Sequence, residues 1–282
     1  MKKIFCALLM LVVSASTVFA ASHRVGLVER LNTTPEDFRK IVEESKNVVL
    51  MTNNPTTPRF SFYRSANEMI LALRAGEIDE ILMPEAVADY TLSIHPEYII
   101  NCVILTRNPY LLSFGFKSNN KELAGLFNKA LIEMKKDGTL ITLQGKYILG
   151  ANTAMLEESA IINPDASTPD PVVFRKFEGA KTIKAAVTGD MPPIDYIAPD
   201  GSAQGFNAAI LAEICSRLGV NVELINIESG ARAAMLASGR ADVVFWFEHR
   251  RGSSTFHDVP EGVILSEPYY EFDTFYHLKP AD

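Results

Sequence analysis

The sequence has few cysteines, and past its first 21 residues it has no long hydrophobic run. No later stretch reaches the roughly 20 uninterrupted apolar residues that a membrane-spanning helix needs. Two of the three cysteines, Cys102 and Cys215, lie far apart in apolar segments, which favours buried free thiols over a disulfide. We therefore expect a mature chain that is not inserted in a membrane and does not depend on disulfides.

The sequence also has fewer basic than acidic residues. The chain has 27 Lys and Arg against 34 Asp and Glu, a net charge of -7. An acidic surface repels phosphate backbones and anionic lipids, so we expect no nucleic-acid partner. The histidines show no metal-ligand spacing and no glycine-rich nucleotide loop is present, so we expect no metal and no cofactor.

The N-terminus has the pattern of a secretory signal peptide. Lys2 and Lys3 precede an apolar core at residues 4–13, and small residues follow at the end of the segment. Cleavage after Ala20 is expected, which would leave a mature chain with a net charge of -9. We assign residues 1–21 to the signal peptide and expect a periplasmic protein.

Two segments of the mature chain repeat one design. Residues 69–83 and 233–247 each consist of an amphipathic helical stretch, a glycine, an aspartate and an apolar strand. Glycine ends a helix by adopting a left-handed conformation, at Gly76 and at Gly239. A strand that is apolar on both faces is typical of a parallel sheet covered by helices. Each copy therefore predicts one unit of a separate α/β lobe.

Further elements surround both copies. The first copy is flanked by predicted strands at residues 24–29 and 48–51 and a helix at 35–45; the second by strands at 183–187 and 221–225 and a helix at 207–218. The order strand, helix, strand, helix, strand thus occurs twice. We expect an α/β fold of two doubly wound lobes joined by a hinge.

The C-terminal half resembles the first lobe of the family 3 extracellular solute-binding proteins, the type II periplasmic receptors of amino-acid ABC transporters. The matching segments are residues 186–196, 200–201, 205–207, 239–242 and 265–270. The last of these resembles the strand that crosses between the lobes of the family. The resemblance implies a two-lobed receptor that closes around a solute.

The N-terminal half resembles the second lobe of the same family, which normally follows the first. Residues 32–38, 76–79 and 108–116 carry this resemblance, and residues 127–131 and 136–139 resemble the closing helices of the family, which pack back on the first lobe. The inverted order indicates a circular permutation, which a surface connection and exposed new ends permit. A swapped dimer is the alternative, and we favour a monomer because the connection is long enough to close within one chain.

This interpretation divides the mature chain into four parts. They are the second lobe with a hinge strand at residues 22–112, helices that pack on the first lobe at 113–149, a surface connection at 150–179, and the first lobe with a hinge strand at 180–282. Three prolines among small polar residues support the surface connection.

Several side chains are expected near the cleft from their place in the elements. Thr33 and Thr34 precede a helix whose free amides suit a carboxylate, although an ordinary helix cap explains them too. Asp190, Ile194 and Tyr196 follow a strand at its carboxyl end, where open α/β sheets bind ligands. Phe206 and Asn207 begin the long helix near the same edge, and for Tyr196 and Phe206 a core position is the alternative.

The second repeated unit leads into residues where the chain departs from the family pattern. Trp246 and Glu248 replace small residues, and Arg250 or Arg251 comes a few positions earlier than the carboxylate-binding arginine of the family. Either arginine can hold a carboxylate, or both can form a solvated basic turn. Where the family usually has an ammonium-binding aspartate, Pro84 stands here, so Glu85 would have to replace it.

These observations predict a receptor rather than an enzyme. It would capture an amino acid or a related organic anion and deliver it to an ABC permease in the inner membrane. The sequence shows no recognisable set of nucleophile, base and orienting residue, although a dehydratase-like enzyme of the same fold is an alternative. A ligand-sensing subunit of a signalling system is the third possibility, because lobe closure would serve it equally.

Overall fold

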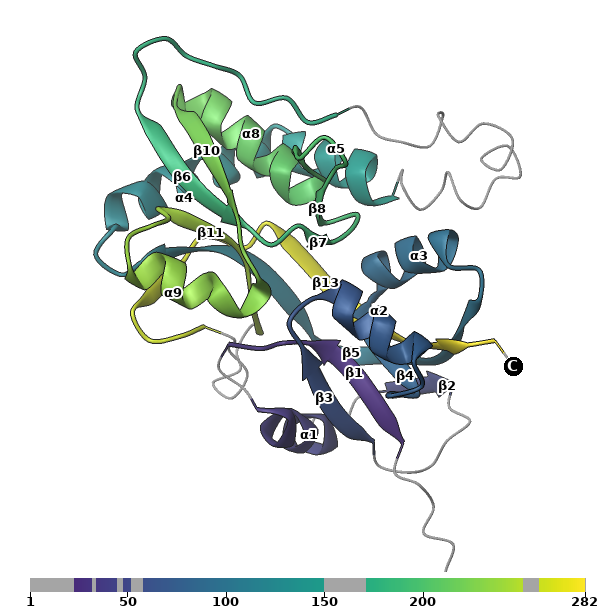
Figure 1. Cartoon of the computed structure of the whole chain (residues 1–282). Helices are drawn as coiled ribbons and strands as arrows, with labels where there is room; N and C mark the ends of the chain where they lie inside the picture. The colour runs from purple at the N-terminus through teal and green to yellow at the C-terminus, as the bar shows by residue number, and fades with distance from the viewer. Residues whose placement is uncertain are drawn as a thin grey trace, which may run out of the picture.

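The structure is a computed structural model that describes residues 23–31, 34–44, 48–51, 58–149, 171–250 and 259–281. It consists of two α/β lobes, with the N-terminal lobe below and the C-terminal lobe above in Figure 1. The predicted signal peptide and most of the predicted surface connection lie outside the described residues. Among the described residues, no helix combines the length and apolarity needed to cross a bilayer.

The N-terminal lobe contains the first seven elements of the described residues. They are β1 (Arg24–Val28), α1 (Pro35–Glu44), β2 (Val48–Met51), β3 (Arg59–Tyr63), α2 (Ala66–Arg74), β4 (Glu80–Pro84) and α3 (Glu85–Ile94). β1 lies between β3 and β4 and is parallel to both. Ser65 caps α2 by accepting a hydrogen bond from the Glu68 amide at 3.2 Å.

The C-terminal lobe contains the helices that follow the long strand β5 (Tyr98–Lys117) and a second parallel sheet. Its elements are α4 (Lys121–Lys136), α5 (Thr139–Gln144), η1 (Gly145–Leu149), β6 (Thr182–Val187), β7 (Asp190–Met191), β8 (Asp195–Ile197), β9 (Ala203–Gln204), α8 (Phe206–Leu218), β10 (Asn221–Asn226), η3 (Ser229–Ala231), α9 (Arg232–Ala237), β11 (Val243–Arg250) and β12 (Val263–Leu265). β6 lies between β10 and β11 and is parallel to both. Each lobe therefore places its first strand between two parallel neighbours.

Two long antiparallel strands, β5 and β13 (Tyr270–Pro280), run through both lobes. Hydrogen bonding therefore continues from one sheet into the other. Pairing slips once between the lobes, because Phe272 faces Tyr110 whereas Thr274 faces Leu105. Four residues of β5, 106–109, thus stand opposite Asp273 alone. This bulge marks the hinge.

The helices α4 and α5 pack on the C-terminal lobe. On α4, Phe127 lies against Phe114 of β5, with ring centroids 5.4 Å apart. The turn between α4 and α5 meets the end of α8, where Arg217 pairs with Asp137 at 2.8 Å and donates to the Thr139 hydroxyl at 3.0 Å. These contacts join the middle of the chain to the C-terminal lobe.

One strand of the N-terminal lobe was predicted and another was not. Residues 48–51 form β2 as predicted, and this strand pairs antiparallel with β5, whereas β3 lies parallel to β1. Phe60 and Phe62, two residues apart on one face of β3, both contact Phe38 of α1 at 5.0 and 6.3 Å between ring centroids. The strand β3 was not predicted from the sequence.

Candidate functional site

A pocket lies between the two lobes. The N-terminal lobe contributes the residues after β1, the end of β4 and the start of α2, and the C-terminal lobe contributes Met191, Trp246 and Glu248. It has about 520 Å³ of empty space, part of it continuous with solvent. Both lobes thus present the carboxyl ends of parallel strands, where open α/β sheets bind ligands.

The walls of this pocket are mainly apolar. They are built by Leu27, Val28, Ala66, Met69, Leu82, Met83, Pro84, Val87, Met191, Trp246 and Phe275. Methionine side chains are unbranched and adapt to the shape of what they contact. The charged groups that line the pocket are Glu29, Arg30 and Glu248. The pocket is therefore suited to a solute with an apolar body and a charged group.

An ion pair crosses the pocket from lobe to lobe. Arg30 follows β1, and its Nη1 atom lies 2.6 Å from Oε2 of Glu248 on β11. The two side chains are only 10% and 6% exposed. The Arg30 guanidinium also lies 5.3 Å from the centre of the Phe38 ring. Because both charges are largely removed from water, each depends on a partner of opposite sign.

A second contact between the lobes involves Asp190. Its Oδ2 atom accepts a hydrogen bond from the backbone amide of Ala66, the first residue of α2, at 3.3 Å. Burial raises the pKa of Asp190, which hydrogen bonding to Thr188 and Ala66 counteracts. Its buried Oδ1 atom has no hydrogen-bond partner within the described part of the chain. The Asp190 carboxylate of the C-terminal lobe thus binds at the N-terminus of α2 in the N-terminal lobe.

The tryptophan in the pocket wall is held in an unusual backbone conformation. Trp246 has a φ of +36°, and the pairing of β11 with β5 shifts between Val244 and Phe247. Such a bulge redirects a side chain out of the sheet. The Trp246 indole donates to the Thr188 hydroxyl at 3.0 Å, and the fully buried Arg232 guanidinium lies 3.9 Å from its ring centre. These contacts fix the ring against the C-terminal lobe.

Asp195 positions the loop that carries Asp190. It is fully buried, and its Oδ2 atom accepts hydrogen bonds from the Thr188 amide at 3.2 Å, the Thr188 hydroxyl at 3.0 Å and the Gly189 amide at 3.3 Å. Burial raises the pKa of Asp195 to about 6, against these bonds. Asp195 therefore supports both Asp190 and, through Thr188, Trp246.

Three of the predicted site residues meet at the pocket. Trp246 and Glu248 line it, and Asp190 accepts a hydrogen bond from the amide of Ala66, which also lines it. Arg30 after β1, Met69 of α2 and Phe275 of β13 also line the pocket and were not predicted. Arg30 has no motif around it, and its pairing with Glu248 is visible only in three dimensions.

One predicted site residue, Arg250, contacts the hinge. Its guanidinium donates to the carbonyl of Asn108 at 3.1 and 3.3 Å, and it lies 4.9 Å from the centre of the Tyr110 ring. Asn108 belongs to the hinge bulge of β5. Arg250 thus contacts the hinge and is not among the residues that line the pocket, and its predicted contact with a solute carboxylate stays a prediction. Arg251 and Thr33 lie outside the described residues.

The other predicted site residues also lie outside the lining of the pocket. Thr34 is exposed and caps α1, because its hydroxyl accepts from the Asp37 amide at 3.2 Å. Glu85 is exposed at the start of α3 and accepts from the Tyr276 hydroxyl at 3.0 Å. Ile194, Phe206 and Asn207 are fully buried in the C-terminal lobe, and Tyr196 is half-buried. Their predicted ligand contacts stay predictions.

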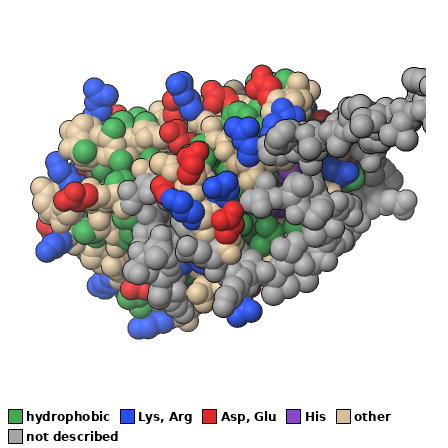
Figure 2. Space-filling view, turned by 90° about the horizontal axis from the view of Figure 1, so that it is seen from below, with side chains coloured by type: hydrophobic (Ala, Val, Ile, Leu, Met, Phe, Trp, Pro, Cys, Tyr) green, Lys and Arg blue, Asp and Glu red, His purple; other side chains and the backbone are tan. Residues whose placement is uncertain are grey.

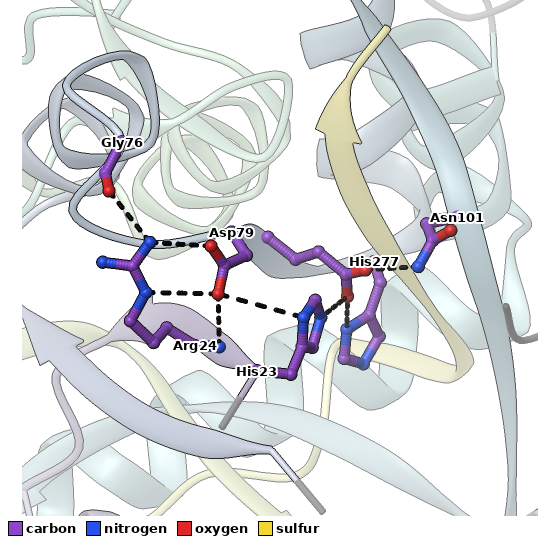
Figure 3. Close-up of polar contacts among 7 residues, drawn as sticks. His23, Arg24, Gly76, Asp79, Asn101 and His277 are labelled. Carbon is purple, nitrogen blue, oxygen red and sulfur yellow. Dashed lines mark hydrogen bonds and ion pairs between the residues drawn. The ribbon is translucent and has the colours of Figure 1, made fainter. Parts of the chain in front are cut away.

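A second polar cluster lies at the other end of β1, away from the pocket (Figure 3). One oxygen of the buried Glu80 carboxylate is 2.9 Å from Nε2 of His23 and 2.7 Å from Nδ1 of His277, and the Asn101 amide donates to the other oxygen. Burial opposes ionisation of Glu80, but the bonds from His277 and His23 outweigh it and lower the pKa of Glu80. The described residues contain no group of three or more His, Cys, Asp or Glu placed to hold a metal ion.

Charged side chains of both signs lie on the face of the molecule seen in Figure 2. In Figure 2, which views the molecule from below, basic and acidic side chains are interspersed over the described part of that face. This mixture of signs accords with the acidic composition.

Residues 183–250, from β6 to the end of β11, match the sequence profile of the bacterial extracellular solute-binding proteins, family 3. This segment of the C-terminal lobe is similar to that family. The resemblance predicted for this half of the chain is thereby confirmed, and the family segment contains Asp190, Trp246 and Glu248. A search of curated proteins finds no match.

Solved structures with a related arrangement include binding proteins of import systems. The zinc-bound ligand-binding component of an ABC-type import system from Staphylococcus aureus is 6% identical, with a TM-score of 0.43 and coverage of 92% of this chain and 66% of that one. The alkanesulfonate-binding protein SsuA from Xanthomonas axonopodis is 8% identical, with a TM-score of 0.40 and coverage of 92% and 65%. The chain thus spans about two thirds of the length of these proteins, and similarity at this level identifies no ligand.

Proposed function

We propose that the chain is an exported receptor that captures a small organic solute between its lobes and delivers it to an ABC permease. The observation that carries this proposal is the pocket lined from both lobes, with Arg30 and Glu248 on opposite sides. A solute bound there contacts both lobes at once, so its binding can change how the lobes are held against each other.

The walls and charges of the pocket favour one class of solute. A carboxylate can take two hydrogen bonds from a guanidinium such as that of Arg30. Trp246, Met69 and Phe275 offer apolar and aromatic surface to the rest of the molecule. We infer an amino acid or a related organic anion with an apolar body.

We also infer that the order of the lobes is a circular permutation of the family order. The family segment lies in the C-terminal lobe, whereas the N-terminal lobe and the helices α4 and α5 precede it in the chain. A single chain pairs both lobes through β5 and β13, which supports a monomer over a swapped dimer. Light scattering on the purified protein tests this, with a mass of about two chains as the contradicting result.

The function is tested by a thermal-shift screen of amino acids, organic acids and amines. A solute at 100 times its dissociation constant adds about 2.7 kcal/mol to the stability of the folded state. We expect Arg30→Gln and Glu248→Gln to abolish the shift. Arg59→Gln, which removes an exposed charge from β3, is the matched control and is expected to preserve it.

Two results would count against the proposal. Unchanged solute affinity in both Arg30→Gln and Glu248→Gln would remove the pocket from consideration as the binding site. Conversion of the bound solute by the purified protein would replace the receptor with an enzyme of the same fold.

A further inference from the structure

The two lobes are held together by side chains of the protein itself. Glu248 of the C-terminal lobe contacts Arg30 of the N-terminal lobe at 2.6 Å, and Asp190 of the C-terminal lobe accepts from the Ala66 amide at 3.3 Å. In both contacts the carboxylate comes from the C-terminal lobe. The N-terminal lobe supplies a guanidinium and a helix N-terminus, which are the two kinds of group that bind anions best in proteins.

These contacts lie at the place where a solute would bind. Glu248 and Arg30 line the pocket, as does Ala66. Glu248 is 6% exposed and Arg30 is 10% exposed, so lobe opening would return both charged groups to water. The pair is thus complete only when the lobes are closed.

Structural support behind both carboxylates holds them in position. Asp195 binds the Thr188–Gly189 backbone immediately before Asp190, and Glu248 lies in β11 two residues after Trp246, which Arg232 and Thr188 fix. Rigid placement reduces the ordering cost of forming each contact between lobes. The C-terminal lobe therefore presents two fixed carboxylates, and the N-terminal lobe presents the hydrogen-bond donors that they meet.

We propose that the lobes close on each other without a solute, with Glu248 and Asp190 of the C-terminal lobe taking the place of an anionic ligand on the N-terminal lobe. An entering anion then competes with Glu248 for Arg30 and with Asp190 for the α2 amides. The resting state is closed, and a solute binds by replacing internal carboxylates. Solute binding accordingly changes which groups hold the lobes together more than how far apart they stand.

The test measures the distance between the lobes in the full chain without solute. Spin labels are attached at Leu71→Cys on α2 and Ile141→Cys on α5, two positions that are 61% and 65% exposed on different lobes. The native Cys102 and Cys215 are buried, and burial raises their thiol pKa values to about 11 and about 12, which disfavours their labelling. Mass spectrometry establishes beforehand that no small molecule has co-purified.

We expect one short distance in the solute-free protein. Glu248→Gln is expected to lower the ratio of short-distance to long-distance molecules at least about tenfold, since it removes a charge-assisted bond between lobes. The double variant Arg30→Glu with Glu248→Arg, which exchanges the two charges, should restore the short distance. Such a rescue would not occur if the single variant had simply damaged the fold. Glu223→Gln, at an exposed position of β10, is the control and should leave the distance unchanged.

A long distance in the solute-free protein, or a short one that Glu248→Gln does not alter, would overturn the inference. This result is independent of the proposed function, because no solute is needed. A receptor that is open at rest would retain its thermal shift with solute. Conversely, a chain that closes by itself and responds to no solute would contradict the proposed function alone.

Discussion

Replacement of Glu80 by glutamine is expected to destabilise the protein while leaving the pocket intact. Glu80 is 2% exposed, and its carboxylate holds His23, His277 and Asn101 at once. These partners come from the residue before β1, from β13 and from β5, so the carboxylate joins both ends of the described chain to the sheet (Figure 3). Glutamine keeps the size but loses the charge and one acceptor.

The magnitude follows from the burial of these groups. Removing the partner of a buried hydrogen-bonding group costs about 1 to 3 kcal/mol, and more where the lost partner is charged. Three groups lose the Glu80 carboxylate together, but His23 retains some solvent access at 15% exposure, so we expect a loss of about 3 kcal/mol. Urea unfolding of the wild type and of Glu80→Gln at neutral pH measures the difference.

The stability that Glu80 contributes should fall as the solution becomes acidic. The pKa of Glu80 lies below its ordinary value of 4.5 in the folded protein. Ionised Glu80 therefore contributes its stability in full above pH 4.5, and this contribution is lost as the pH falls through the lowered folded-state pKa. The stability difference between the wild type and Glu80→Gln should shrink correspondingly in acid.

The control for this experiment is Glu77→Gln, which removes an exposed carboxylate close in sequence. It should change the free energy of unfolding by no more than about 0.5 kcal/mol. A loss of less than about 0.5 kcal/mol in Glu80→Gln, or a loss that stays constant from neutral pH into acid, would refute the reasoning.

Three further outcomes are expected. Arg250→Ala should lower the free energy of unfolding by about 1 to 3 kcal/mol, because its bonds to the hinge carbonyl of Asn108 are lost. Its affinity for solute should change less than twofold. A tenfold loss of affinity by calorimetry would show that Arg250 belongs to the binding site. Phe114→Ala should cost about 3 to 5 kcal/mol in urea unfolding, because the ring is fully buried in the aromatic core of the C-terminal lobe, and a cost below about 1 kcal/mol would contradict that packing. Cys102 and Cys215 should react with a thiol reagent only after unfolding, and rapid labelling of the native protein would be inconsistent with their burial.

Much of the fold could be predicted because local patterns determine it. The two repeated units form α2–β4 and α9–β11, each with the glycine between helix and strand, Gly76 or Gly239, at positive φ. Both cysteines are buried and free, as predicted. The place of β3 could not be predicted, because it depends on the contact of Phe60 and Phe62 with a separate helix.

The site was less predictable than the fold, since it is built from residues distant in sequence. Asp190 follows the end of β6, and Trp246 and Glu248 lie in the apolar strand of the second repeated unit and its continuation; these local signals brought them into the prediction. Arg30 pairs with Glu248 across the lobes, and no spacing in the sequence indicates that pair. Arg250 donates to the carbonyl of Asn108 in the hinge, a contact that no sequence pattern indicated, and its role as a carboxylate ligand stays a prediction.

The central claim is that the solute binds between the lobes, and the fluorescence of Trp246 tests it most directly. Trp246 is the single tryptophan of the chain, and it lies in the pocket wall. A solute that raises the melting temperature should change the emission of Trp246 saturably, with the same dissociation constant that calorimetry gives. A solute that stabilises the protein fully and leaves this emission unchanged at saturation would place the binding site elsewhere and contradict the account.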